Sequence, residues 1–207
     1  MTKAKDLRRR AWEKLRGKWG TMAVATLIYV LILGACSALS LIYIGGIAAL
    51  LLTGALVLGL SGMALLVARN QSVRTENLFG GFKNYGSSLA LYLLCTIFTF
   101  LWTLLFIIPG IIKSLSYSMS YFVLADFPDM PANQARKRSM ELMRGHKWRL
   151  FCLCFSFIGW LLLTVLTLGI LSFWIMPYMM TAQAEFYREI AGETAAPVPQ
   201  YEQNEQI

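Results

Sequence analysis

Long apolar runs without a charged residue are the feature that most constrains this chain. Residues 21–43 form the first of them, and about 20 apolar residues is the length that an α-helix needs to cross a bilayer. Only 14% of the 207 residues are charged, whereas a soluble domain has roughly 25%. The sequence therefore predicts an all-α integral membrane protein and excludes an ordinary soluble fold.

The apolar runs fall into three pairs, and short turn signals such as Pro109-Gly110 separate the members of each pair. We expect six transmembrane helices arranged as three hairpins, over residues 21–43, 47–68, 88–108, 111–125, 148–167 and 170–187. The fourth run is short for a helix that rises about 1.5 Å per residue, and whether it crosses fully stays open. We expect one membrane domain, residues 1–191, followed by a disordered acidic tail, residues 192–207.

The basic residues predict the orientation of these helices. All 19 Lys and Arg residues except Lys113 lie in residues 1–19, 69–87 and 126–149 or after the last apolar run. Because basic segments stay on the cytoplasmic side, we expect both termini in the cytoplasm of a multi-pass protein. The net charge of +8 then indicates anionic lipids of the cytoplasmic leaflet as partners, and no nucleic acid.

A basic segment precedes each predicted hairpin. LRRRAWEKLRG, residues 7–17, aligns without a gap to ARKRSMELMRG, residues 135–145, and a weaker copy lies midway, around Arg74 and Gly81. We interpret this as a three-fold internal repeat. At 100° per residue the two stronger copies place apolar residues on one side and basic residues opposite, the pattern of an amphipathic helix at a membrane interface.

Two interpretations of these basic helices stay open. In the first, they only set the topology and pack as a collar around the membrane helices. In the second, they recognise anionic lipid headgroups or a protein partner, with about 1 kcal/mol from each basic residue near an anionic surface. The candidate contacts are Arg8, Arg10, Arg16, Arg136, Arg138 and Arg144.

A second group of candidates lies inside the apolar runs, where Lys113 is the one charge distant from the basic segments. Intramembrane ionisable groups are functional candidates, although a lysine near the interface also reaches water along its own stem. The candidate intramembrane site comprises Thr99, Thr103, Lys113, Tyr117 and Tyr121. We expect these polar side chains to join the third and fourth helices by hydrogen bonds. The alternative is a transporter of small solutes or lipids.

Signatures of enzymes and cofactors are missing from the sequence. There is no phosphate-binding loop, no paired carboxylates and no nucleophile with a nearby base. The four cysteines lie in apolar runs, where cysteine usually serves as a small core residue. We therefore expect a non-enzymatic protein without a cofactor or metal, which acts as a scaffold or as the subunit of an unknown partner.

Several motifs together resemble a known family. They are Ile107-Ile108-Pro109-Gly110-Ile111-Ile112-Lys113 with Tyr117-Ser118, Phe82-Lys83-Asn84-Tyr85-Gly86, Ser139 to Lys147, Phe155 to Trp160, and Pro177-Tyr178 with Phe186-Tyr187. In these the chain resembles the bacterial domain-of-unknown-function 975 family of integral membrane proteins. More distantly, it is similar to membrane domains that accompany glycerophosphodiester phosphodiesterases. The resemblance implies a bacterial inner-membrane protein, and it supplies no catalytic residues.

Overall fold

The computed structural model describes residues 4–39, 44–105, 107–167, 169 and 171–192. Within these ranges the secondary structure is entirely helical. The elements are α1 (Ala4–Leu15), α2 (Trp19–Leu39), α3 (Ile44–Ala68), the 3-10 helix η2 (Thr75–Phe82), α4 (Tyr85–Leu105), α5 (Ile107–Tyr117), α6 (Ser120–Asp126), α7 (Ala132–Leu142), α8 (Lys147–Phe155), α9 (Ile158–Leu166) and α10 (Ser172–Ile190). Of the predicted tail, residues 192–207, all but Gly192 lie outside the described residues.

Four stretches of the described chain are long and apolar enough to cross a membrane. They are Trp19–Cys36, Leu51–Ala68, Tyr85–Leu104 and Lys147–Leu166. They coincide with the first, second, third and fifth predicted spans. The membrane class of the protein is thus supported, whereas six spans are not confirmed.

The fourth and sixth predicted spans differ from these four. Residues 111–125 are divided at Ser118–Met119 into α5 and α6, as the fifth predicted span is divided at Ser156–Phe157 into α8 and α9. Unlike the fifth span, this segment is not among the four stretches that are long and apolar enough to cross a membrane. The helix α10 has 19 residues, but its last part carries Glu185, Arg188 and Glu189.

The Pro109-Gly110 pair does not form the turn that the sequence predicts. Both residues lie in the first turn of α5, where a missing backbone N–H costs nothing because the first four N–H groups of a helix have no partner inside it. A Cβ on Gly110 would lie 2.4 Å from the Thr103 hydroxyl oxygen. This glycine therefore lets α5 pack closely against α4.

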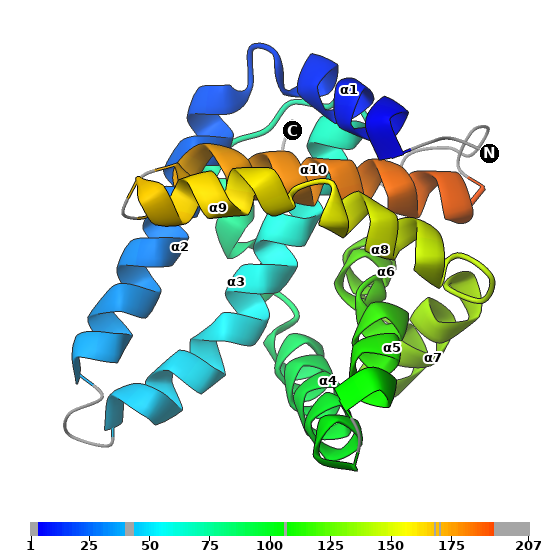
Figure 1. The fold of residues 1–207 in the computed structure, drawn as a ribbon. Coiled ribbons are helices and arrows are strands. Elements are labelled where there is room, and N and C mark those ends of the chain that lie inside the picture. Colours follow the sequence, from blue (N-terminus) through cyan, green and yellow to red (C-terminus); the bar gives the residue numbers. More distant parts are fainter. Residues whose placement is uncertain (1–3, 40–43, 106, 168, 170, 193–207) are drawn as a thin grey trace, which may run out of the picture.

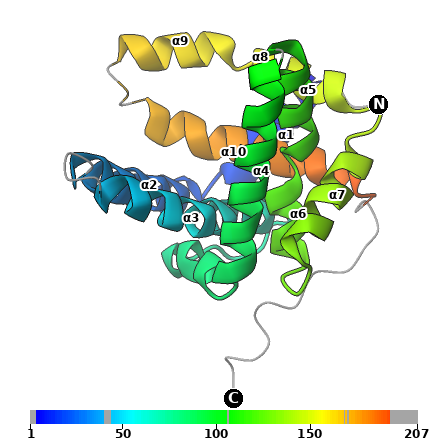
Figure 2. The same cartoon turned by 90° about the horizontal axis from the view of Figure 1, so that it is seen from below.

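The hairpins diverge from a common base. Figure 1 shows α2 and α3 extending to one side and α4 and α5 to the other, while α10 runs across between α1 and the rest. Seen from below, α2 and α3 remain on the opposite side from α4–α7 (Figure 2). The helix α10 contacts α1, α2, α3, α8 and α9.

Each element that precedes a hairpin packs against a different hairpin. The helix α1 contacts α10 and α8, η2 contacts α3, and α7 contacts α4, α5 and α6. In α1 the side chains of Leu7, Ala11 and Leu15 are buried. The protein itself therefore covers these three apolar side chains of the amphipathic helix, whereas Trp12 is exposed.

The structure matches the first and third copies of the repeat better than the middle one. Gly17 and Gly145, which align in sequence, both have positive φ, at 81° and 78°, and so end their helices in a conformation that favours glycine. The middle copy is a 3-10 helix in which Phe79 is exposed. The three-fold repeat is not confirmed.

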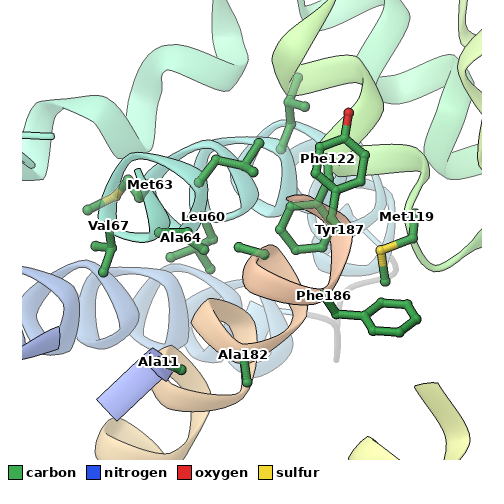
Figure 3. Packing of buried hydrophobic residues seen from close by; sticks show 14 of the residues in the cluster. Ala11, Leu60, Met63, Ala64, Val67, Met119, Phe122, Ala182, Phe186 and Tyr187 are labelled. Carbon is green, nitrogen blue, oxygen red and sulfur yellow. The ribbon is translucent and has the colours of Figure 1, made fainter. Parts of the chain in front are cut away.

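The core lies along α3. Of its apolar window Leu51–Ala68, 67% is buried, against 11% of Tyr85–Leu104 in α4. Figure 3 shows Leu60, Ala64 and Val67 of α3 beside the helix that carries Ala182, Phe186 and Tyr187. On the other helices large apolar side chains stay exposed, among them Leu104 and Val165. Such an extended apolar surface is typical of a lipid-facing one.

Two glycines bring η2 into direct backbone contact with α3. A Cβ on Gly59 would lie 1.8 Å from the carbonyl oxygen of Leu78, and one on Gly81 would lie 2.0 Å from that of Ala55. No side chain fits at either position. Small residues in the second predicted span thus serve close packing, as is common in membrane proteins, although the partner is a 3-10 helix.

We expect Gly59→Ala to destabilise the protein by about 1–3 kcal/mol, the usual cost of overpacking a closed contact. Thermal unfolding of the purified protein in detergent should show a lower midpoint. Gly20→Ala is the matched control, because no atom lies within 4 Å of a Cβ at Gly20. A midpoint that stays unchanged in Gly59→Ala would contradict the close α3–η2 contact.

Candidate functional site

The predicted lipid contacts divide into two groups. Arg10, Arg16, Arg138 and Arg144 are exposed, whereas Arg8 and Arg136 are half-buried. Arg8 donates a hydrogen bond of 3.0 Å to the carbonyl oxygen of Ser156, and its guanidinium lies 5.4 Å from the centre of the Phe157 ring. Its partners are therefore groups of the protein.

Arg136 aligns with Arg8 in the repeat and has the same kind of surroundings. Its guanidinium lies 4.5 Å from the ring centre of Phe98 and 5.4 Å from that of Tyr117. It also donates to the Asn133 side-chain oxygen at 2.9 Å. Arg8 and Arg136 thus anchor α1 and α7, and the exposed arginines are the ones left for an external ligand.

The candidate intramembrane residues have different surroundings in the structure. The ammonium of Lys113 lies 4.8 Å from the Trp102 ring centre, a cation–π contact. Tyr117 is buried beside Arg136. Tyr121 packs against the edge of the core. The transport interpretation stays a prediction.

The hydrogen bonds of this group also differ from the expected pattern. The Thr103 hydroxyl donates to the carbonyl oxygen of Thr99 at 2.8 Å, within α4. The Ser116 hydroxyl likewise donates to the carbonyl oxygen of Ile112 in its own helix. These two hydroxyl hydrogens are therefore used within their own helices, and the expectation of a hydrogen-bonded contact between α4 and α5 stays a prediction.

A buried ion pair joins the ends of α3 and α6. Arg69 contacts Asp126 through both terminal nitrogens, at 2.7 Å and 2.9 Å. The two side chains are only 10% and 5% exposed. The Tyr187 hydroxyl of α10 donates to the same carboxylate at 2.9 Å. Three predicted spans thus meet at one carboxylate.

A second ionic group joins α1 to α10 and α3. The Lys14 ammonium lies 2.7 Å from a Glu185 carboxylate oxygen, and Arg188 lies 3.3 Å from the same oxygen. Both cations also donate to the backbone carbonyl of Ala68, Arg188 at 2.6 Å. Because the last carbonyls of a helix lack partners inside it and attract cations, these contacts cap α3.

Two further contacts belong to this group of charged residues at the helix ends. Arg149 of α8 pairs with Glu189 of α10 at 2.7 Å. Lys18 donates to the carbonyl oxygen of Gln71. Burial, together with the neighbouring charge of Lys14, lowers the pKa of Lys18. Ion pairs and hydrogen bonds from these cations thus link the segment before α2, the segment after α3, the end of α6, the start of α8 and the end of α10.

The sequence pattern alone did not reveal this centre, because Asp126 and Glu185 lie at the ends of apolar runs, where a carboxylate is typical of the membrane interface. Both are buried, with Asp126 at 8% and Glu185 at 6% exposure of the whole residue. The available signal was that each carboxylate stands alone at the edge of an apolar run. Such residues need a partner when the ends of the runs pack together.

A pocket of about 180 Å³ adjoins the Arg69–Asp126 pair, between α3, η2 and the end of α6. Its apolar lining comes from α3 and α6, and its polar lining includes Asn77, Lys83 and Asn84. No three His, Cys, Asp or Glu side chains in the described ranges could together hold a metal ion.

We expect Asp126→Asn to destabilise the protein by about 3–5 kcal/mol, because it leaves the buried charge of Arg69 unpaired. Replacing both partners, Arg69→Met with Asp126→Leu, should recover much of the loss. The measurement is thermal unfolding in detergent for each variant and the double variant.

The exposed Arg138–Glu141 pair supplies the control, since both side chains are 56% exposed. Glu141→Gln should change the stability by no more than about 1 kcal/mol. If Asp126→Asn were as mild as this control, the Arg69–Asp126 pair would not hold the helix ends together.

Comparison with known proteins gives one match. The family model described as "Protein of unknown function (DUF975)" matches residues 1–116 and 104–194. No curated protein matches, and no solved structure matches. The more distant likeness to membrane domains of glycerophosphodiester phosphodiesterases stays a prediction. The chain belongs to the DUF975 family, whose function is unknown.

Proposed function

We propose that this protein is a non-enzymatic scaffold of the bacterial inner membrane, which holds the anionic cytoplasmic leaflet with a basic collar. The collar is defined as four exposed residues: Arg10 in α1, Arg16 just after it, Arg138 in α7 and Arg144 just after it. The carrying observation is that α1 and α7 bury their apolar sides in the protein, which leaves these basic side chains exposed.

The orientation follows from the same residues. The ionic contacts of Lys14, Arg69, Asp126 and Glu185 gather the charged helix ends into one region. Under the positive-inside rule this region faces the cytoplasm, together with both termini. Six membrane-embedded segments in three hairpins fit this orientation. Anionic lipid and an unknown protein partner are the proposed ligands of the collar.

The collar predicts a preference for anionic lipid. Changing Arg10, Arg16, Arg138 and Arg144 together to Gln should lower the enrichment of phosphatidylglycerol among lipids that copurify in mild detergent. Each charge contributes about 1 kcal/mol near an anionic surface, which is about fivefold in affinity. Mass spectrometry of the copurified lipids measures the enrichment.

The matched control keeps the charge, with Lys at the same four positions, and should retain the enrichment. Arg8→Gln should lower the unfolding midpoint while leaving the lipid preference near that of the parent, because Arg8 contacts the protein. If the four-Gln variant enriched phosphatidylglycerol as the parent does, headgroup recognition would be wrong and only the packing role would remain.

Orientation has its own test. After the four native cysteines are changed to Ser, a cysteine at Gly45 or at Gly169 should react with a membrane-impermeant maleimide added to intact cells. One at Asn133, in the first turn of α7, should react only after the membrane is opened. Labelling of Asn133→Cys from outside would reverse the proposed orientation.

A further inference from the structure

The pocket between α3, η2 and α6 is built by glycines of two kinds. Gly59 and Gly81 are closed against backbone atoms, as described above. Gly62 and Gly80 also line the pocket, but a Cβ on Gly62 would meet only the Ala125 Cβ, at 4.0 Å, and one on Gly80 would meet nothing within 4 Å. The missing side chains of this second pair leave space open.

The lining of the pocket has two chemical faces. Leu58, Met63, Leu65 and Leu124 form an apolar wall and are themselves buried. Asn77 and Lys83, from η2 and the residue after it, lie on the other face. A ligand that satisfies both faces must carry a hydrocarbon part and a polar part.

The net positive charge of the pocket lining favours an anionic ligand. Asp126 is paired with Arg69, whereas Lys83 is exposed and forms no ion pair with any residue that the structure describes. The lining therefore carries one positive charge in excess, at its polar face. An anionic group beside Lys83 would supply the partner that this ammonium lacks.

The size and position of the pocket further restrict the class of ligand that it can bind. About 180 Å³ is less than the roughly 300–1,000 Å³ of pockets that enclose a whole small molecule, so part of the ligand must lie outside. The pocket adjoins the end of the candidate span Leu51–Ala68, where the acyl chains and headgroups of a bilayer meet. A chain segment can therefore enter while the rest of the ligand stays in the lipid.

We propose that this pocket binds an amphiphile with an anionic head and a linear hydrocarbon tail. The tail lies against Leu58, Leu65 and Leu124, and the head faces Lys83. A free fatty acid and an anionic phospholipid share this chemistry. The proposal requires the membrane location but is independent of the basic collar.

The test uses the full-length protein in mild detergent with two photoactivatable probes, a fatty acid and a phosphatidylglycerol, each with a diazirine in its tail. Adducts are located by peptide mass spectrometry. We expect them on residues 58–66 and 124–128. Gly62→Leu, which fills the pocket, should lower this labelling about tenfold, a loss of about 1.4 kcal/mol of binding free energy.

Gly86→Leu is the matched control, because Gly86 is exposed, has no atom within 4 Å of a Cβ and does not line the pocket. It should label like the parent. Equal labelling of Gly62→Leu and the parent would overturn the proposal. Excess unlabelled fatty acid or phosphatidylglycerol on the parent protein shows which source binds, and this arm needs no variant that must fold.

The head is tested by Lys83→Gln, with Lys137→Gln on α7 as the control. Lys83→Gln should lower labelling by both anionic probes and leave that by a photoactivatable phosphatidylcholine unchanged. Phosphatidylcholine labelling as strong as that of the anionic probes in the parent would overturn the anionic assignment. The four-Gln collar variant should still label in the pocket, so that failure of the collar and failure of the pocket are distinguishable.

Discussion

The ion pair between Arg69 and Asp126 is the interaction on which the arrangement of the helices depends. It joins the end of α3 to the end of α6, and the Tyr187 hydroxyl brings α10 to the same carboxylate. Both charges are withdrawn from water, so each is acceptable only while the other is present. A shift of α3 or α6 would destabilise the protein, because it would separate a buried charge from its partner.

Side chains on the protein-facing side of α1 and α7 donate hydrogen bonds to backbone carbonyls that have no partner in their own helix. The breaks after α5 and α8 each free carbonyl groups, and where water is excluded such groups must find donors in the protein. Arg8 of α1 donates to the carbonyl oxygen of Ser156, and Ser139 of α7 donates to that of Ser116 at 2.8 Å. The amphipathic helices α1 and α7, whose pattern is typical of a membrane interface, thus also cap the ends of broken helices in the protein.

This dual role separates structure from proposed function within a single basic segment. Arg8 and Arg136 hold the helices in place by stacking on aromatic rings, while the neighbouring Arg10 and Arg138 remain exposed. Repetition of a basic pattern therefore says little about ligands. The pocket at Lys83 lies apart from these helices and has separate chemistry, with a hydrocarbon-lined wall and one cation unpaired among the described residues. If both proposals hold, the protein contacts anionic amphiphiles in two ways, on its surface and in a cavity.

The sequence by itself determined the helical membrane class, the family and four of the apolar spans, because uncharged runs of this length have few other stable environments. It could not show that residues 111–125 divide into two helices, that Arg8 turns inward, or that Asp126 is buried. Only the tertiary structure decided these points, because each depends on which segments, distant in the chain, lie close enough to donate a hydrogen bond or neutralise a charge. The pocket arises in the same way, from α3, η2 and α6 meeting around glycines whose missing side chains leave space.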